Sequence, residues 1–383
     1  MVGSKSNCVY VNGSNRPYYH RRCKGKISST NIESLPDELV FDILLHLQSE
    51  DIHRGARLVC KKWYNTVRTR NFRCARLRNS TVGLLIHSSG DERPIFLTLE
   101  KGRVEMSKLS YKIPGRVWTS CNGLILDYEV MRDGIYLFTL NPATKRCFDL
   151  PPFISRSDSS YDYSGIAYAA ASMEYKVAQT FSSRLRYPFV RGCAILTVGV
   201  DKFWRHVDTE NLSPIGREIL RGIPLTTEGY FHWTHREGTR VLTLNVETEI
   251  ITETLVPNGY GKKTKYYLST GRSLTLLIAC SGFSWEVLKM KSETGEWTKL
   301  TKVDLKARKC EFEQFVRECC GPVVQPSSLV IKPVGWLDEE VLVLNAFPTL
   351  VCVLYKVRAQ EIEFVELDFD DDDLNFQVHR IRM

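Results

Sequence analysis

The residues that most resemble a chemical site are two histidines, three positions apart in the segment His232-Trp-Thr-His235. A structural metal site needs about four cysteine, histidine or carboxylate ligands, and neither a cysteine nor a carboxylate pair stands near this segment. The pattern therefore fits a β-strand better than a metal site. Glu361 and Glu363 alternate along another short segment, which indicates the solvated face of a strand rather than a pair of catalytic acids.

The chain contains 12 cysteines. Cys319 and Cys320 are adjacent, and no two cysteines have the Cys-x-x-Cys spacing that brings two thiolates onto one tetrahedral metal. No cysteine and histidine array matches the zinc ligands of a RING finger. We therefore predict reduced thiols in the hydrophobic core, no metal site, and a location in the cytoplasm or nucleus, because these compartments keep thiols reduced.

Other catalytic motifs are also missing from the sequence. It has no phosphate-binding glycine loop, no Gly-x-Ser-x-Gly nucleophile elbow and no His-Glu-x-x-His zinc motif. No candidate nucleophile stands in a pattern that would supply it with a base. We predict no catalytic residue and no cofactor.

The net charge of +8 is distributed unevenly. Residues 1–32 are predicted to form a disordered basic leader, and the aspartates at 370–373 belong to a predicted acidic tail, residues 369–383. Binding DNA or RNA needs cations gathered on one face with a recognisable motif, so we predict no nucleic-acid partner. The basic segment 21–26 is typical either of a weak nuclear import signal or of a solvated leader.

Apolar segments are short throughout the chain. Residues 1–32 contain no apolar stretch as long as that of a secretory signal, and the run 274–280 is far too short to cross a bilayer. We therefore predict neither secretion nor membrane insertion.

The clearest structural element is a helix predicted between Ser34 and Leu47. Ser34 is a suitable N-cap, Pro36 suits the first turn, and the acidic Asp37 and Glu38 favour the positive end of the helix dipole. Apolar residues recur every four positions along the rest of the segment. One face of this helix must therefore be buried.

Two shorter helical segments follow this helix. Ser49 is a suitable cap for the second one, and Ile52, Ala56 and Val59 mark its apolar side. A third segment continues through Trp63. A unit of about forty residues rarely buries enough surface to be stable alone, so we expect something else to cover it.

The order of these residues resembles an F-box. The residues that carry the resemblance are Leu35, Pro36, Glu38 and Leu39, then Ile43, Leu44 and Leu47, then Leu58, Val59, Cys60, Lys61, Lys62 and Trp63. The resemblance implies a three-helix F-box domain at residues 33–75, which docks on a Skp-type adaptor of cullin-based ubiquitin ligases. The implied adaptor contacts are Leu35, Pro36, Glu38, Leu39, Ile43, Leu44, Leu47, Ile52, Val59, Cys60 and Trp63.

Two further expectations concern this unit. Gln48 stands where a proline commonly follows the first helix of an F-box, so the second helix is expected to start differently. Lys62 is expected on the solvent side, away from the adaptor. The alternative to an F-box is an ordinary helical cap that packs on its own β domain.

The rest of the chain alternates short apolar runs with polar turns. Six turns recur about 40 to 65 residues apart, which is the spacing expected of four-stranded blades. These turns stand at residues 100–102, 141–144, 199–202, 247–249, 292–295 and 358–360. We predict an all-β, six-bladed β-propeller over residues 80–368, because radial packing buries both faces of every blade. A β-sandwich fits the strands but not their regular spacing.

This β region resembles the F-box-associated, kelch-like domain of plant F-box proteins. The carriers are Ser120-Cys121-Asn122-Gly123-Leu124, Asn141-Pro142-Ala143-Thr144-Lys145, Leu150-Pro151-Pro152, and Trp204-Arg205 after Asp201. The chain has no Gly-Gly pair and no Trp-Asp dipeptide, so it is not an orthodox kelch or WD repeat. Simple turn chemistry is the alternative explanation of each motif taken alone.

Together the two resemblances imply a substrate receptor of an SCF-type ubiquitin ligase. The F-box would bind the adaptor and, through it, a cullin and a RING subunit, while the β domain would bind an unidentified protein substrate. Tyrosine and arginine are frequent binding anchors. Candidate substrate contacts of these two types, which could equally lie in solvated connections, are Tyr161, Tyr163, Arg184, Arg186 and Tyr187.

Two other functions fit the same sequence. One is a β-propeller enzyme or carbohydrate-binding protein that uses the central pocket of the ring. The other is a Skp-binding F-box protein that acts outside a cullin complex.

Overall fold

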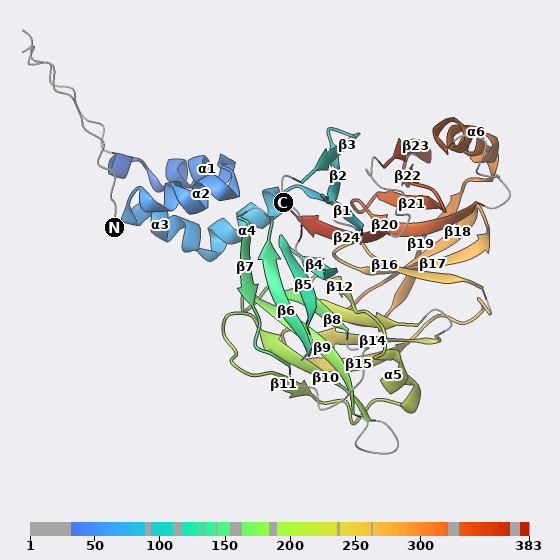
Figure 1. Cartoon of the computed structure of the whole chain (residues 1–383), viewed down its shortest axis with the longest axis horizontal. Helices are drawn as coiled ribbons and strands as arrows, with labels where there is room; N and C mark the ends of the chain where they lie inside the picture. Colours follow the sequence, from blue (N-terminus) through green and yellow to red (C-terminus); the bar gives the residue numbers. More distant parts are fainter. Residues whose placement is uncertain are drawn as a thin grey trace, which may run out of the picture.

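The computed structural model describes residues 32–88, 93–109, 113, 116–131, 134–142, 144–153, 163–183, 190–235, 238–261, 263–320, 329–367 and 376–382. A group of short helices precedes a large β region, and these helices project from one side of it (Figure 1). Apart from Ile32, the predicted basic leader lies outside the described residues.

Residues 32–79 contain four α-helices and two 3₁₀ turns. These elements are η1 (Ile32–Ser34), α1 (Asp37–His46), α2 (Ser49–Arg54), η2 (Ala56–Leu58), α3 (Lys61–Arg68) and α4 (Arg70–Asn79). The three predicted helical segments correspond to α1, to α2 with η2, and to α3. The sequence did not indicate α4, because Phe72 is its single buried side chain and its apolar periodicity is therefore weak.

The helix caps differ from the prediction. α1 begins at Asp37 with Pro36 as its N-cap, so Ser34 ends η1 instead of capping α1. Gln48 is the N-cap of α2, and Ser49 is already its first helical residue. The acidic residues do occupy the first turns of both helices, where the helix dipole favours them.

The strands in the described part of the chain form six four-stranded antiparallel sheets, which are the blades of a six-bladed β-propeller. In the spatial order of the strands, blade 1 consists of β24 (Phe376–Arg382), β1 (Val82–Ser88), β2 (Ile95–Glu100) and β3 (Arg103–Lys108); blade 2 of β4 (Arg116–Cys121), β5 (Leu124–Met131), β6 (Gly134–Asn141) and β7 (Arg146–Asp149); blade 3 of β8 (Ser164–Ala169), β9 (Glu174–Ser183), β10 (Val190–Thr197) and β11 (Arg205–Val207).

The other three blades follow in chain order. Blade 4 consists of β12 (Leu225–Thr227), β13 (Tyr230–Thr234), β14 (Arg240–Asn245) and β15 (Ile250–Leu255); blade 5 of β16 (Lys265–Ser269), β17 (Leu274–Ser281), β18 (Ser284–Met290) and β19 (Trp297–Asp304); blade 6 of β20 (Val330–Trp336), β21 (Val341–Phe347), β22 (Val351–Lys356) and β23 (Glu361–Glu366). The prediction of six blades is confirmed.

The ring is closed by the last strand of the chain. β24 pairs with β1 over seven positions, from Val82 opposite Arg382 to Ser88 opposite Phe376. The first strands of neighbouring blades contact one another around the whole ring, and β24 lies between β20 and β4 in this series. Residues 376–382 are thus part of blade 1, and the prediction of a tail over residues 369–383 is wrong for this segment. The aspartates at 370–373 lie outside the described residues.

Each of the six predicted turns joins the third and the fourth strand of one blade. Five of them also contain a residue with a left-handed φ, which a tight hairpin turn needs, and the turn at 141–144 is followed directly by one. These residues are Lys101 (50°), Lys145 (54°), Gly199 (75°), Glu249 (57°), Gly295 (72°) and Gln360 (54°).

Both faces of the blades are buried against their neighbours. On β1, Leu84 and Ile86 pack against blade 6, whereas Leu85 packs against blade 2. On β21, Leu342 and Leu344 face blade 5 in the same alternating manner. Side chains of a strand point alternately to its two faces, so nearly continuous apolar runs are required where both faces are covered.

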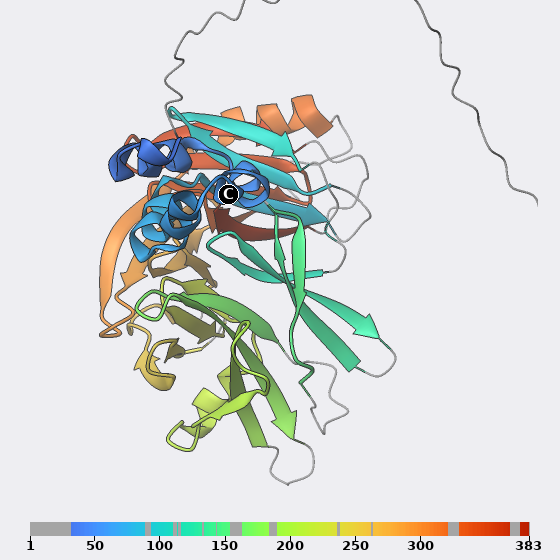
Figure 2. The ribbon, with the colours of Figure 1, turned by 90° about the vertical axis from the view of Figure 1, so that its left-hand side faces the viewer.

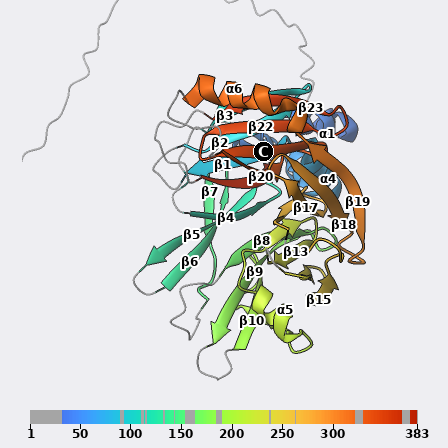
Figure 3. The same cartoon turned by 90° about the vertical axis from the view of Figure 1, so that its right-hand side faces the viewer.

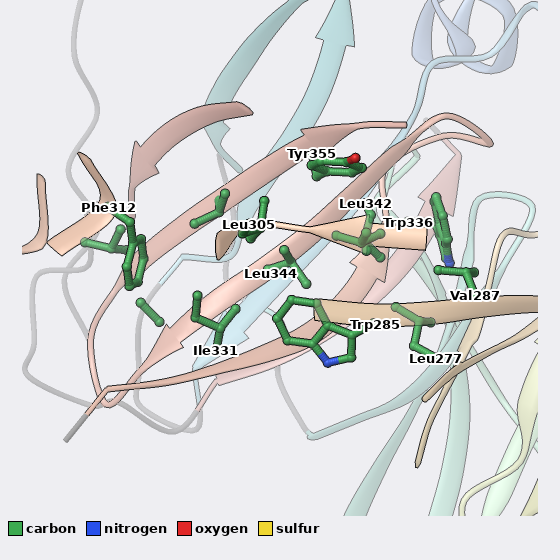
Figure 4. Close-up of a cluster of buried hydrophobic side chains, with 14 of the residues drawn as sticks. Leu277, Trp285, Val287, Leu305, Phe312, Ile331, Trp336, Leu342, Leu344 and Tyr355 are labelled. Atoms are coloured by element: carbon green, nitrogen blue, oxygen red, sulfur yellow. The ribbon is translucent and has the colours of Figure 1, made fainter. Parts of the chain in front are cut away.

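The contact between blades 5 and 6 shows how these layers are filled (Figure 4). Trp285 and Trp336 are almost fully buried there, and the indole N–H of Trp336 donates a hydrogen bond of 2.9 Å to Thr275 Oγ1. α6 (Lys309–Cys320), preceded by η3 (Lys306–Arg308), covers the outer end of this layer with Phe312 and Val316 (Figure 3). α5 (Pro214–Ile219) covers the layer between blades 3 and 4 in a similar way.

The predicted strand position is correct for the first histidine of the pair only. His232 lies on β13 and is fully buried, with its ring nitrogens 2.8 Å from Thr227 Oγ1 and 3.0 Å from Thr243 Oγ1. His235 lies beyond the end of the strand and is exposed. The two imidazoles therefore do not converge on one point.

A pair of fragments tests the role of β24. Residues 80–383 contain all six blades, so we expect this fragment to be soluble, with a β-type far-ultraviolet spectrum and a cooperative thermal transition. Residues 80–367 lack β24, which leaves β1 as an unpaired edge and removes Ile381 from the layer between blades 1 and 2. This shorter fragment should aggregate or unfold without a cooperative transition. Equal melting curves for the two fragments would show that β24 is dispensable.

His232 predicts an acid-dependent loss of stability. Burial lowers the pKa of His232 to about 3, from 6.5 for an exposed histidine. Between these pH values the unfolded chain binds a proton that the folded chain does not, so the free energy of unfolding falls as the pH falls, by up to about 1.4 kcal/mol per pH unit for one such group. His232→Gln should therefore flatten the dependence of the urea midpoint on pH between about 6 and about 4. An unchanged slope would contradict this assignment.

Candidate functional site

The N-terminal helices enclose a small core of their own, separate from the layers of the propeller. Val40 and Leu44 of α1 pack against Ala56, Trp63 and Phe72. The repeat of four residues on α1 places Val40 and Leu44 on the same side of the helix. Their side chains are fully buried, so this side of α1 is covered by the unit itself.

α4 links this small core to the propeller. The guanidinium of Arg76 donates a hydrogen bond of 2.7 Å to the carbonyl of Leu45 and one of 3.1 Å to Ser49 Oγ, and burial lowers its pKa. At the other end of the helix, Arg70 donates a hydrogen bond of 3.3 Å to the carbonyl of Ala170 in the turn between β8 and β9. α4 is therefore held by contacts on both sides.

Lys62 is not the free solvent-side residue that the sequence suggested. Its ammonium group donates a hydrogen bond to the carbonyl of Leu35 and forms a 2.6 Å ion pair with Asp37. These contacts tie the start of α3 to the segment that leads into α1. Lys62 thus helps to hold α1 and α3 together.

The eleven predicted adaptor contacts separate into three groups by exposure. The exposed ones are Pro36, Glu38, Leu39, Ile43 and Val59; the half-buried ones are Leu35, Leu47, Ile52 and Cys60; the buried ones are Leu44 and Trp63. Leu44 and Trp63 belong to the small core, so their prediction as surface contacts is corrected. The structure thus separates the residues that form the core of the helical unit from those that lie on its surface.

The exposed apolar side chains on these helices are large. Leu39 and Ile43, four positions apart on α1, are 50% and 41% exposed. After α2, Leu58 and Val59 are 69% and 44% exposed, and Tyr64 of α3 is 40% exposed. Leu58 and Tyr64 were not among the predicted contacts, although Leu58 stands within the F-box-like motif. We refer to Leu39, Ile43, Leu58, Val59 and Tyr64 as the apolar surface.

Four of the five predicted substrate contacts lie outside the described residues. These are Tyr161, Arg184, Arg186 and Tyr187. The fifth, Tyr163, is half-buried and packs its ring edge-to-face on Trp118 at 5.2 Å between centroids. Its backbone N–H donates a hydrogen bond of 3.3 Å to Thr180 Oγ1. Tyr163 thus has a structural role between blades 2 and 3.

None of the described cysteines forms a disulfide bond, and most of them are not in the core. Only Cys193 and Cys352 are buried, so the prediction of core thiols is correct for these two among the described cysteines. Burial raises the pKa of the Cys352 thiol to about 12. Within the described ranges, no three histidine, cysteine or acidic side chains are grouped so that they could hold a metal ion. No helix in these ranges is long and apolar enough to span a membrane.

Two neighbouring residues of α1 test the division between core and surface. Leu44→Ala should destabilise the helical unit by about 2 to 5 kcal/mol, because it leaves a cavity beside Trp63. Ile43→Ala should change the stability by less than about 0.5 kcal/mol, because Ile43 lies on the surface. Hydrogen exchange of the α1 amides in the full chain measures both effects. Equal exchange rates in the two variants would contradict the separation.

Comparison with protein families gives a match for the helical unit. Residues 32–75 match the F-box domain family. Comparison of the chain with curated protein sequences gives no match.

Comparison with solved structures returns proteins of low sequence identity. TolB from Acinetobacter baumannii is 8% identical, with a TM-score of 0.44 over 79% of this chain and 66% of that chain. A chain of the nidogen/laminin complex is 11% identical, with a TM-score of 0.44 over 78% of this chain and 98% of that chain. The SapL1 lectin in complex with alpha methyl fucoside is 9% identical, with a TM-score of 0.41 over 76% of this chain and 94% of that chain. At these values the likenesses say nothing about function. The chain thus has an F-box domain at residues 32–75, followed by a six-bladed β-propeller.

Proposed function

We propose that this protein is a substrate receptor of an SCF-type ubiquitin ligase. F-box domains typically bind Skp-type adaptors, and an F-box followed by a β-propeller fits a substrate receptor in general. In this proposal the F-box domain binds the adaptor and, through it, a cullin and a RING subunit. The propeller binds the protein to be ubiquitinated, in the cytoplasm or the nucleus.

The observation that carries the proposal is the apolar surface. Leu39 and Ile43 of α1 are exposed while Val40 and Leu44 of the same helix form the core, so α1 has apolar side chains both inside and outside the unit. Exposed large apolar side chains that gather on one small domain are typical of a protein-binding surface. The propeller does not cover these side chains, so we expect a second protein to bind over them.

Contacts between the sequence motifs support an F-box-associated type of propeller. Trp204, from the last of these motifs, donates a hydrogen bond of 2.8 Å from its indole N–H to the carbonyl of Pro151. Arg205 forms a 3.2 Å ion pair with Asp201. Asn122 and Gly123 take left-handed φ values of 44° and 85° in the turn between β4 and β5. We infer that these motifs act together to join blades 2 and 3.

In this function the chain itself would catalyse no reaction. F-box proteins are generally non-catalytic, and a receptor raises the rate of ubiquitin transfer by holding the target close to the catalytic subunits. Substrate contacts at Tyr161, Arg184, Arg186 and Tyr187 stay predictions. The identity of the substrate can be determined by affinity purification with the degradation machinery inhibited.

Introducing two negative charges into the apolar surface tests the proposal. Leu39→Glu combined with Ile43→Glu should weaken capture of the adaptor at least about a hundredfold, because each carboxylate would lose its hydration in an apolar contact and 1.4 kcal/mol already corresponds to about tenfold. The far-ultraviolet spectrum should not change, because both residues are exposed in the folded chain. Co-purification of adaptor and cullin with the full chain measures the effect.

The matched control places the same charges on the propeller. Val130→Glu with Val200→Glu changes two apolar residues that are 66% and 63% exposed, and it should leave adaptor capture unchanged. Undiminished capture by the Leu39 and Ile43 variant would refute the adaptor contact. Capture of adaptor without cullin by the unmodified chain would favour an F-box protein that acts outside a cullin complex.

A further inference from the structure

A cleft of about 560 Å³ lies between the F-box domain and the propeller. One wall is formed by α2, η2, α3 and α4, and the other by the turn between β6 and β7 and by strands β8 and β9 with their connecting turn. In Figure 2 these helices, in blue, lie on the side nearest the viewer, and the green strands of blades 2 and 3 lie mostly below them. The volume falls in the range of small-molecule sites, which is about 300 to 1,000 Å³.

The charged side chains that line this cleft are all basic. Arg57, Arg68, Arg73 and Arg76 line it together with His53, and among the residues that the structure describes no aspartate or glutamate does. Within the described residues, none of these four arginines forms a salt bridge with a carboxylate, whereas Arg54, just outside the lining, pairs with Glu50 at 2.8 Å. The cleft therefore concentrates positive charge that no carboxylate in the described part of the chain neutralises.

Two polar atoms in this lining are buried without a hydrogen-bond partner. They are Nε of Arg57 and Nε2 of His53. A buried donor without a partner costs about 1 to 3 kcal/mol, and more when the group is charged. The pKa of His53 is lowered by burial first and then by the positive charges of Arg146, Arg57 and Arg54. His53 thus lies in surroundings that are partly shielded from water and positively charged.

The wall from the propeller contributes neutral hydrogen-bonding groups. Tyr168 and Tyr175 line the cleft, and so do Asn141 and Thr144 of the turn between β6 and β7. The Tyr175 hydroxyl already donates to the carbonyl of Asn122 at 3.0 Å, and the amide oxygen of Asn141 accepts from the Thr144 N–H at 3.1 Å. A ligand in the cleft would therefore contact arginines on one side and polar, uncharged groups on the other.

We propose that this cleft binds a small anion with two or more phosphate groups, which bridges the F-box domain and blades 2 and 3. Guanidinium groups match phosphate oxygens in geometry and stay charged at every physiological pH. Four arginines exceed what one carboxylate or one monophosphate would neutralise, so the charge favours a polyphosphate. This proposal goes beyond the receptor function, and its test needs neither adaptor nor substrate.

A bound anion would also have a mechanical consequence. The arginines come from η2, α3 and α4 of the helical unit, while Tyr168 and Tyr175 belong to blade 3. Contacts to both walls would hold the two domains in one relative orientation. In a ubiquitin ligase, this orientation decides where the target lies relative to the catalytic subunits.

The test measures binding of tripolyphosphate to the full chain by isothermal titration calorimetry. Arg57→Gln with Arg73→Gln removes two charges from the cleft and should weaken binding at least about tenfold, since each lost charge-assisted hydrogen bond contributes strongly. The control, Arg78→Gln with Arg103→Gln, removes the same number of charges from exposed positions on α4 and β3 outside the lining and should leave binding unchanged. Absence of binding to the unmodified chain, or an equal loss in both variants, would overturn the proposal.

A second measurement needs no variant and so does not depend on how the variants fold. Phenylglyoxal modifies arginine side chains, and peptide mass spectrometry locates the modified residues. Tripolyphosphate should protect Arg57 and Arg73 in the unmodified chain but not Arg78 and Arg103. Equal labelling with and without tripolyphosphate would refute the site. Tighter binding of a singly phosphorylated peptide than of tripolyphosphate would also refute it, because the cleft would then recognise a phosphorylated protein.

Discussion

The pairing of β24 with β1 is the constraint on which the β region depends. Every blade buries apolar side chains on both faces, so every blade needs a neighbour on each side, and a row of blades would leave two faces uncovered. The seven paired positions between β1 and β24 bring the two ends of the β region into one blade, and this closes the row into a ring. The buried layers between blades then follow from closure, because no blade is left at an end.

The helical domain is attached to this closed ring. The F-box helices have their own core, and α4 leads directly into β1, the strand that β24 pairs with. Arg76 holds α4 to the end of α1, and Arg70 holds it to the turn after β8. The helical domain is therefore held at a defined position relative to the propeller, and the basic cleft lies where the two domains meet.

Local patterns in the sequence predicted the fold well because they arise from local physics. All six predicted turns join strands of one blade, since a left-handed φ in a short polar segment depends on few neighbouring residues. The F-box motif marked α1 to α3 for the same reason. The prediction failed for β24, because its partner β1 stands near the other end of the chain and the acidic run before β24 resembles the start of a tail.

The sequence by itself determined the type and order of the elements, the number of blades and the F-box motif, because hydrophobic periodicity and turn chemistry act over a few residues. Only the tertiary structure decided which apolar residues are covered. Periodicity marks Leu39, Ile43 and Leu44 on one stripe of α1, but burial depends on where α3 and α4 pack, so Leu44 is in the core while Leu39 and Ile43 are exposed. The basic cleft was equally hidden in the sequence, because its two walls come from the helices and from blades 2 and 3, which meet only in the folded chain.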